Sequence, residues 1–390
     1  MKNMIIETID QLKNDFYNVS QYIGQNPELG NEEYKACKIL TETLEEHHFQ
    51  VTTNVVNVPT AFEAVYDSGK PGPHIGFMAE YDALPEIGHA CGHNLIGTMG
   101  IAAGIALSKV VSETGGKVFL YGTPAEETRG AKVTMSEEGV LDHLDVALMA
   151  HPSGGYRKSG SSLAMDALQF AFYGKAAHAA ASPEDGINAL DAVLQTFHSI
   201  NALRQHVTSD VRIHGIIPEG GQAANIVPDY AVAQFYVRAE KRSSLNDVVN
   251  KVKNCAEGAA LATGARLEIS NYEYSYDDMI TNEELSDCFT EKLLEVGIPN
   301  EDVLEARGGG SLDMGNVSQR VPSIHPYIQI SDQPITAHTH EFREAALRQR
   351  GFEGMIVAAK ALALTGYEIL TNDDVLAKIK KEFEANQSLT

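Results

Sequence analysis

The sequence predicts an α/β protein in which a mostly parallel sheet forms the main domain and a second, α+β domain is inserted into it. Three observations lead to this prediction. Helix-like and strand-like segments alternate from residue 5 to residue 152, the order changes to βαββαβ after residue 164, and alternation returns after residue 278. With 390 residues, the chain is long enough to build two separate cores.

The first part of the main domain alternates helices with strands. Apolar residues recur at helical spacing, or small residues dominate, over residues 5–23, 33–48, 94–111 and 130–141. Strand-like apolar runs bounded by Gly and Pro cover residues 61–67, 74–82, 117–124 and 146–152. This alternation is typical of a sheet whose strands are mostly parallel.

The middle of the chain has a different order of elements. Strands are expected over residues 167–175, 210–220, 229–239 and 265–271, and long helices over 185–206 and 244–263. The resulting order, βαββαβ, is that of the ferredoxin-like unit. We therefore expect a discontinuous main domain, residues 1–163 and 279–390, and an inserted ferredoxin-like domain, residues 164–278.

Charge excludes two classes of partner. The chain carries 53 Asp and Glu against 30 Lys and Arg, a formal net charge of −23, with no cluster of basic residues. Such a surface repels phosphate backbones and anionic lipids. We expect neither nucleic acid nor a membrane as a partner.

Targeting signals and cysteines indicate the compartment. The N-terminus lacks the apolar segment of a secretory signal, and the longest apolar stretch, residues 96–107, is short and Gly-rich. The four cysteines are scattered, without the spacing of a disulfide framework. We expect a cytoplasmic protein.

Metal-ligand residue types gather where predicted strands end. Cys91 and His93 are separated by one residue at a turn, and a thiolate with an imidazole suits zinc-like divalent cations. Taken alone, the pattern is also typical of a buried Cys beside a helix-capping Asn94. Other acidic and His residues follow strands at Asp82, Glu126, Glu127 and His151, and His338 and His340 lie near the C-terminus. Because ligands collect beyond the carboxyl ends of parallel strands, this pattern predicts one shared site.

Several motifs together resemble a known family. They are "GFMAEYDALPEIGHACGHN", "GTPAEET", "GAK", "MAHP", "GKAAHAA", "GGQAANIVPDYA", "GGGSLDMGNVSQ" and "AHTHEF". In this order, over roughly residues 60–345, they are similar to the M20 family of two-metal metallopeptidases and amidohydrolases, which includes carboxypeptidase G and aminoacylase. Within it they resemble subfamily D, the aminobenzoyl-glutamate and auxin-conjugate hydrolases. The motifs are specific for the family and not for a substrate.

The resemblance implies roles for individual residues. It makes Cys91 a bridging ligand of two divalent metal ions, zinc or manganese, with terminal ligands at His93, Glu127, His151 and His338. His340 competes with His338 for the last position. Glu126 matches the general base, Asp82 the acidic residue behind the site, and His178 the residue that reaches the substrate from the partner subunit of a homodimer. The alternative for His178 is that it caps the Ala-rich turn that follows it.

The sequence departs from the family pattern at two positions. Asn94 stands where many relatives have Asp, and Glu80 stands where other subfamilies have a ligating His. Three further residues are candidate substrate contacts: Asn225, Arg238 and Gly309. The run Gly308–Gly310 lacks the Lys-Ser/Thr of a phosphate-binding loop, so we interpret it as a wall of the substrate pocket. For Asn225 and Arg238 a structural role in the insert is an equally good interpretation.

The expected activity is metal-dependent hydrolysis of an amide bond. Two metal ions can activate a water and polarise the amide carbonyl, and a free carboxylate then moves the proton to the leaving nitrogen. The adjacent Glu126 and Glu127 would divide proton transfer and metal binding between them. We expect a dipeptidase or a deacylase of N-acyl amino acids, with a catalytically weak binding or regulatory homologue as the alternative.

Overall fold

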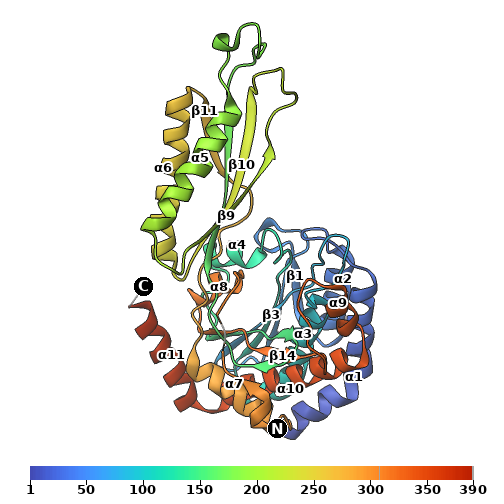
Figure 1. Ribbon diagram of the computed structural model, residues 1–390. Helices are drawn as coiled ribbons and strands as arrows, with labels where there is room; N and C mark the ends of the chain where they lie inside the picture. The colour runs from blue at the N-terminus through green and yellow to red at the C-terminus, as the bar shows by residue number, and fades with distance from the viewer. Residues whose placement is uncertain (307, 389–390) are drawn as a thin grey trace. The chain divides into compact units, whose positions relative to one another are not determined.

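A six-stranded sheet organises the larger part of the chain in the computed structural model, which describes residues 1–306 and 308–388 (Figure 1). Its strands, in spatial order, are β1 (Gln50–Thr53), β2 (Phe62–Asp67), β4 (Lys117–Gly122), β3 (His74–Ala79), β5 (Val146–Leu148) and β13 (Ser323–Ile324). The pairs β4–β3, β3–β5 and β5–β13 are parallel, whereas β1–β2 and β2–β4 are antiparallel. Almost every residue of β3, β4 and β5 is buried, because helices cover both faces of a parallel sheet. The predicted α/β class is confirmed.

Helices surround this sheet. They are α1 (Lys2–Gln25), α2 (Tyr34–Glu46), α3 (His93–Thr114), α4 (Ala131–Glu137), α7 (Glu283–Glu295), α8 (Met314–Ser318), α9 (His340–Ala346), α10 (Gln349–Thr371) and α11 (Asp373–Gln387). Helices α1 and α10 both pack against α3, which is buried along nearly its whole length. Among the described residues, two helices, α3 and α10, are long and apolar enough to cross a membrane, and most of each is buried inside the protein, as core helices are.

Small residues let α3 approach the sheet closely. A Cβ at Gly97 would lie 2.8 Å from the carbonyl oxygen of Glu80, and one at Gly104 would lie 2.4 Å from the Leu120 side chain. Any larger residue would push the helix away. The helix begins at His93, so this close packing also fixes His93 beside the chain that leaves β3.

A smaller sheet of short strands lies in the same part of the chain. Its order is β12 (Val303–Leu304), β7 (Tyr156–Arg157), β14 (Tyr327–Gln329) and β6 (His151–Ser153). The segment expected as one strand over residues 146–152 is in fact two strands, β5 and β6, in different sheets. His151 therefore opens a strand of the second sheet.

The chain divides into two compact units, which we call the larger unit, Met1–Ser161 with Met279–Thr390, and the inserted unit, Ser162–Asp278. The sequence places these boundaries at 163/164 and 278/279. Each unit has a hydrophobic core of its own.

The inserted unit has the predicted order of elements. They are β8 (Ala164–Tyr173), α5 (Ala189–Leu203), β9 (Arg212–Glu219), β10 (Tyr230–Ala239), α6 (Arg242–Thr263) and β11 (Arg266–Asn271). The strands form an antiparallel sheet in the order β11-β8-β10-β9. Helices α5 and α6 lie side by side on the sheet (Figure 1). Strands β9 and β11 are the two edges.

Candidate metal centre and active site

Four parallel strands of the large sheet deliver the chemistry-bearing residues to one edge. Asp82 follows β3, Glu126 and Glu127 follow β4, His151 follows β5, and His325 follows β13 directly. Since the carboxyl ends of parallel strands meet at one edge of a sheet, residues far apart in the sequence come together there.

The predicted ligands form three overlapping groups. Within each group the ligand atoms lie within 4.8 Å of one another. The groups are Cys91, His93 and His151; Cys91, Glu127 and His338; and His93, Glu126 and Glu127. All five predicted ligands and the predicted base are thus brought together in the larger unit, and Cys91, His93 and Glu127 each belong to two of the groups.

Asp82 orients His93. The Nδ1–H of His93 donates to Asp82 Oδ1 at 2.9 Å, and both side chains are buried. This hydrogen bond leaves Nε2 of His93 free to ligate a cation, an arrangement common among metal-binding histidines. Burial alone would lower the pKa of His93, but the charge of Asp82 raises it well above its usual value.

His151 presents a lone pair beside the Cys91 sulfur. Its Nδ1–H donates to the carbonyl oxygen of Pro152 at 2.8 Å, which leaves Nε2, 3.4 Å from Cys91 Sγ, without the proton. Burial lowers the pKa of His151, so the ring is held neutral. Burial raises the pKa of the Cys91 thiol, whereas a coordinated cation deprotonates a thiol.

His338, and not His340, lies with the other ligands. The Nε2 atom of His338 is 3.2 Å from Glu127 Oε1, and the backbone N–H of His338 donates to Ala90 O at 2.9 Å. His338 also has φ of +66°, unusual for a residue other than glycine. His340 begins α9, is exposed, and belongs to none of the ligand groups found among the described residues.

Glu126 and Glu127 have different surroundings. Burial raises the pKa of Glu126 well above its usual value, and the carboxylates of Glu80 and Glu127 add to this effect. Burial would also raise the pKa of Glu127, but the hydrogen bond from His338 and the charge of His93 lower it. Two adjacent carboxyl groups therefore differ in proton affinity, which suits a base and a ligand.

Divalent cations fit this donor set. The buried atoms His93 Nε2 and Glu80 Oε2 have no hydrogen-bond partner among the described residues, although they lie 3.5 Å apart. Glu127 Oε1 lies 4.0 Å from the same imidazole nitrogen and 3.2 Å from His338 Nε2. Unpartnered buried polar atoms are costly, and a cation would satisfy them. One thiolate, three imidazoles and carboxylates are ligands of zinc-like metals.

A buried ion-pair network that sequence reasoning did not assign supports the site. Lys132 Nζ lies 2.6 Å from Glu80 Oε1 and 2.6 Å from Asp313 Oδ1, and all three side chains are buried. Glu80 is thereby held with its second oxygen toward His93. Lys132 and Asp313 both lie in motifs quoted above, "GAK" and "GGGSLDMGN", so the family resemblance contained the signal.

His325 is a second unassigned residue at the site. Its ring centroid is 5.3 Å from that of His151, and its backbone N–H donates to Ser159 Oγ at 2.9 Å. The sequence around it, Ile324-His325-Pro326, repeats the strand-then-His-Pro pattern of Ala150–Pro152. That repetition could have identified it.

His178 and Asn225 lie together in the inserted unit. The backbone N–H of Ala179 donates to Asn225 O at 3.0 Å, and both His178 and Asn225 are exposed. His178 Nδ1 accepts hydrogen bonds from the N–H groups of Ala180 and Ala181, each at 3.2 Å. The neutral ring therefore carries its proton on Nε2, where it can donate to a substrate.

Arg238 lies at the far end of the same sheet from His178. It pairs in register with Met165 at the start of β8, whereas His178 comes after Tyr173 at the end of that strand. The guanidinium contacts Met165 Sδ at 3.7 Å and lies 5.4 Å from the Tyr236 ring centroid. Strands rise about 3.3 Å per residue, so one small substrate cannot contact His178 and Arg238 of the same chain.

Gly309 lies in an exposed loop, where nothing comes within 4 Å of a Cβ built on it. Its role as a pocket wall stays a prediction.

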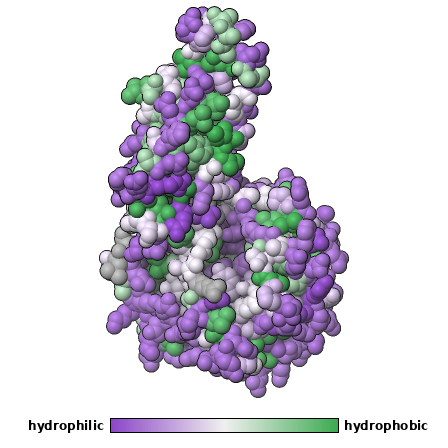
Figure 2. Space-filling model, viewed as in Figure 1, coloured by the Kyte–Doolittle hydropathy of each residue, from purple (hydrophilic) through white to green (hydrophobic). Residues whose placement is uncertain are grey.

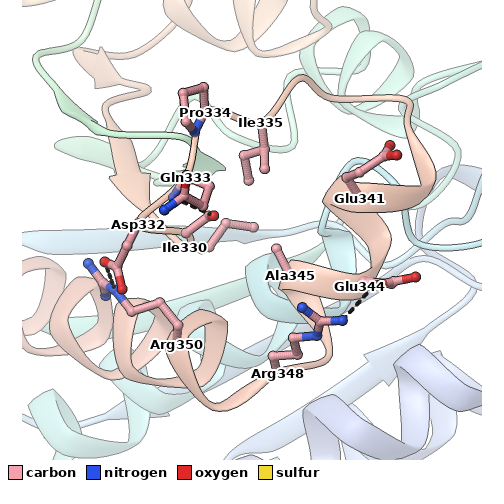
Figure 3. A pocket seen from close by; sticks show the side chains of 11 residues that line it. Ile330, Asp332, Gln333, Pro334, Ile335, Glu341, Glu344, Ala345, Arg348 and Arg350 are labelled. Atoms are coloured by element: carbon pink, nitrogen blue, oxygen red, sulfur yellow. Dashed lines mark hydrogen bonds and ion pairs between the residues drawn. The ribbon is translucent and has the colours of Figure 1, made fainter.

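A cavity of about 440 Å³ lies between residues 330–335 and the α9–α10 segment, next to the loop that carries His338 (Figure 3). Its arginines are already paired, Arg348 with Glu344 and Arg350 with Asp332.

Comparison with known proteins relates this chain to peptidases and hydrolases. A family model described as a peptidase dimerisation domain matches residues 165–263, inside the inserted unit. The chain is 36% identical to the Xaa-Arg dipeptidase of Mus musculus, over 98% of this chain and 92% of the relative. It is 28% identical to one of the subunits of the p-aminobenzoyl-glutamate hydrolase of Escherichia coli, over 97% and 94% of the two chains.

The fold is shared with solved structures. A crystal structure of a dinuclear metal-binding peptidase of the M20 family from Bacillus subtilis aligns with a TM-score of 0.62 at 20% identity, covering 92% of this chain and 99% of that one. An aminobenzoyl-glutamate utilization protein from Klebsiella pneumoniae aligns with a TM-score of 0.71 at 21% identity, covering 94% and 97%.

Proposed function

This chain belongs to the M20 family of metal-dependent peptidases and amidohydrolases, and we propose that within the family it is a dipeptidase for dipeptides with a basic C-terminal residue. The reaction class, hydrolysis of an amide bond in a small substrate, is that of its relatives. The observation that carries the proposal is the gathering of five candidate ligands at one sheet edge, together with Glu126, a carboxyl group whose pKa is raised.

In this proposal, metal binding and proton transfer fall to different residues. When bound, a pair of divalent ions supplies Lewis acidity toward water and the amide carbonyl. Cys91, His93, Glu127, His151 and His338 would hold the ions. Glu126, with its raised pKa, accepts the proton of the attacking water and passes it to the leaving nitrogen. Zinc and manganese both suit these ligands.

His178 completes the site from a partner subunit in this proposal. Its Nδ1 is engaged by two backbone N–H groups, so its Nε2–H is available to donate to the oxygen of the scissile carbonyl as negative charge develops there. Asn225 lies beside it and offers an amide to the same substrate.

Surface features of the inserted unit support a homodimer. Strand β9 is an edge strand, and Ile216 on it is 63% exposed. Leu194 on α5 is also exposed, and hydrophobic residues interrupt the hydrophilic surface of this unit (Figure 2). An exposed apolar edge is an aggregation risk unless it is paired, and pairing across a two-fold axis covers it.

The substrate class comes from the relatives and from charge. The relative at 36% identity is named as a dipeptidase for Xaa-Arg substrates. A chain with net charge −23 attracts cationic substrates over a distance, which favours a basic dipeptide over p-aminobenzoyl-glutamate.

The experiment is a substrate panel with the purified, metal-loaded protein. It compares Xaa-Arg and Xaa-Lys dipeptides with Xaa-Glu dipeptides, N-acetyl amino acids and p-aminobenzoyl-glutamate. The proposal expects the highest kcat/KM for the basic dipeptides. Preferential cleavage of acidic or N-acetylated substrates would contradict the proposed preference for basic dipeptides. Binding without any cleavage would favour the regulatory homologue.

A further inference from the structure

Glu33 is a buried carboxyl group outside the metal centre, with a contact that the reaction scheme above does not use. It immediately precedes α2 and is fully buried. Its side chain makes no capping hydrogen bond to the first turn of α2. The side chain points instead toward the loop after β4, which carries Glu126 and Glu127.

The carboxyl group of Glu33 holds the turn before Glu126. Glu33 Oε1 accepts the backbone N–H of Ala125 at 2.9 Å, and Glu33 Oε2 accepts the Thr60 hydroxyl at 2.8 Å. Thr60 is fixed in turn, because the Tyr81 hydroxyl donates to its carbonyl oxygen. The result is a buried chain of hydrogen bonds that ends at the residue before Glu126.

The Ala125 backbone requires such a restraint. Ala125 has φ of +64°, in the left-handed region that L-residues other than Gly rarely adopt. Strained conformations of this kind persist where surrounding contacts determine them, and they cluster at functional sites. Gly30 of the same N-terminal loop is also in contact, since a Cβ there would lie 2.9 Å from the Ala125 Cβ.

We propose that Glu33 is a positioning residue for catalysis: by holding Ala125 in its left-handed conformation, it aims Glu126 at the substrate. This inference rests on the proposed role of Glu126 as base. Glu127 has restraints of its own, through its backbone N–H on Asp82 Oδ2 at 3.1 Å and its carboxylate on His338. Loss of Glu33 therefore affects proton transfer more than metal binding.

The test is Glu33→Leu, which removes both acceptor oxygens. We expect kcat to fall at least about tenfold, as small misplacements of a catalytic group do, with KM within about twofold and metal content unchanged. Glu33→Gln keeps an acceptor for Ala125 and should recover most of the rate. In an Ala125→Gly background, glycine adopts the turn without strain, so the loss caused by Glu33→Leu should shrink.

Controls separate the possible failures. Glu63→Gln changes a partly buried glutamate that accepts from Tyr121 elsewhere on the sheet, and its kcat should stay within about twofold of wild type. Thr60→Val removes one anchor of Glu33 and should lower kcat in the same direction, which keeps the test available if Glu33→Leu does not fold. If wild type is active and Glu33→Leu has the same kcat, the positioning role is overturned. Where Glu33→Leu does not fold, an unchanged kcat in Thr60→Val overturns it. Equal losses in the Leu and Gln variants overturn it as well. An inactive wild type overturns instead the proposed function.

Discussion

Asp82 contacts two of the predicted metal ligands, His93 and Glu127. Its Oδ1 accepts His93 Nδ1–H at 2.9 Å, and its Oδ2 accepts the backbone N–H of Glu127 at 3.1 Å. One buried carboxylate thus orients a ligand from α3 and a ligand from the loop after β4.

This relationship predicts the effect of Asp82→Asn. The variant should bind metal about 10 to 100 times more weakly, because an outer carboxylate sets the orientation and basicity of the ligating imidazole. Competition with a chelator of known affinity measures the change. Asp142→Asn, which alters a surface pair with Arg320, is the matched control and should bind metal normally. Equal affinities in the two variants would contradict the role of Asp82.

Lys132 should be essential to folding stability. Lys132→Met leaves the carboxyl groups of Glu80 and Asp313 buried without their cation, a change that costs about 3 to 5 kcal/mol in buried pairs. Urea unfolding of the metal-free proteins gives the difference. Lys360→Met breaks a pair with the exposed Asp10 and should cost less than about 1 kcal/mol. Similar losses of unfolding free energy in both variants would show that the buried Lys132 network stabilises the fold no more than a surface ion pair does.

Stability should depend on pH through Glu33. Burial raises the pKa of Glu33 from 4.5 to about 7, and nearby Asp82 acts in the same direction. A raised pKa means that the folded state favours the protonated form, so the stabilisation is complete below pH 4.5 and is lost as pH rises through 7. The loss amounts to about 3 kcal/mol.

Glu33→Gln lacks this titration. From about pH 5 to about pH 8, wild type should therefore lose free energy of unfolding relative to Glu33→Gln, both measured without metal. A constant difference between the two proteins across this range would show that Glu33 does not titrate as expected. A glutamate that costs stability at neutral pH is consistent with retention for catalysis.

Much of this molecule could be predicted from residue patterns. The long strands β3 and β4, buried on both faces, and helices such as α5 and α6 have clear periodicity, and the α/β class followed from their order. Strands β6, β7, β12 and β14 could not be predicted, because segments of two or three residues carry no periodic signal.

The site divides in the same way. Cys91, His93, Glu127 and His151 are of ligand types, Glu127 and His151 follow strands, and Cys91 and His93 lie just before and at the start of α3, so their gathering was predictable. Lys132 and Glu33 were not assigned, because a lysine or a glutamate normally lies on the surface, and only tertiary contacts show these two to be buried. The pairing of Asp82 with both His93 and Glu127 likewise depends on distances that no spacing reveals.

The proposed sharing of the active site between two subunits predicts complementation. Glu126→Gln and His178→Ala chains should each be inactive alone, and mixing them under conditions of subunit exchange should restore up to about half the normal activity per hybrid dimer, since one site then has both residues. The control is Glu126→Gln alone, taken through the same exchange procedure, which should stay inactive. Absence of recovery in dimers shown to have exchanged would place His178 outside the partner's site.

The most direct measurement is the metal content and kcat of Glu126→Gln, determined on one preparation beside Glu127→Gln and a chelator-treated wild type. A base that is not a tight ligand predicts wild-type metal content in Glu126→Gln with kcat lowered by about 100-fold or more, metal loss in Glu127→Gln, and no hydrolysis after chelation. Wild-type rates in both variants, or full activity in the chelated enzyme, would contradict metal-dependent hydrolysis with Glu126 as its base.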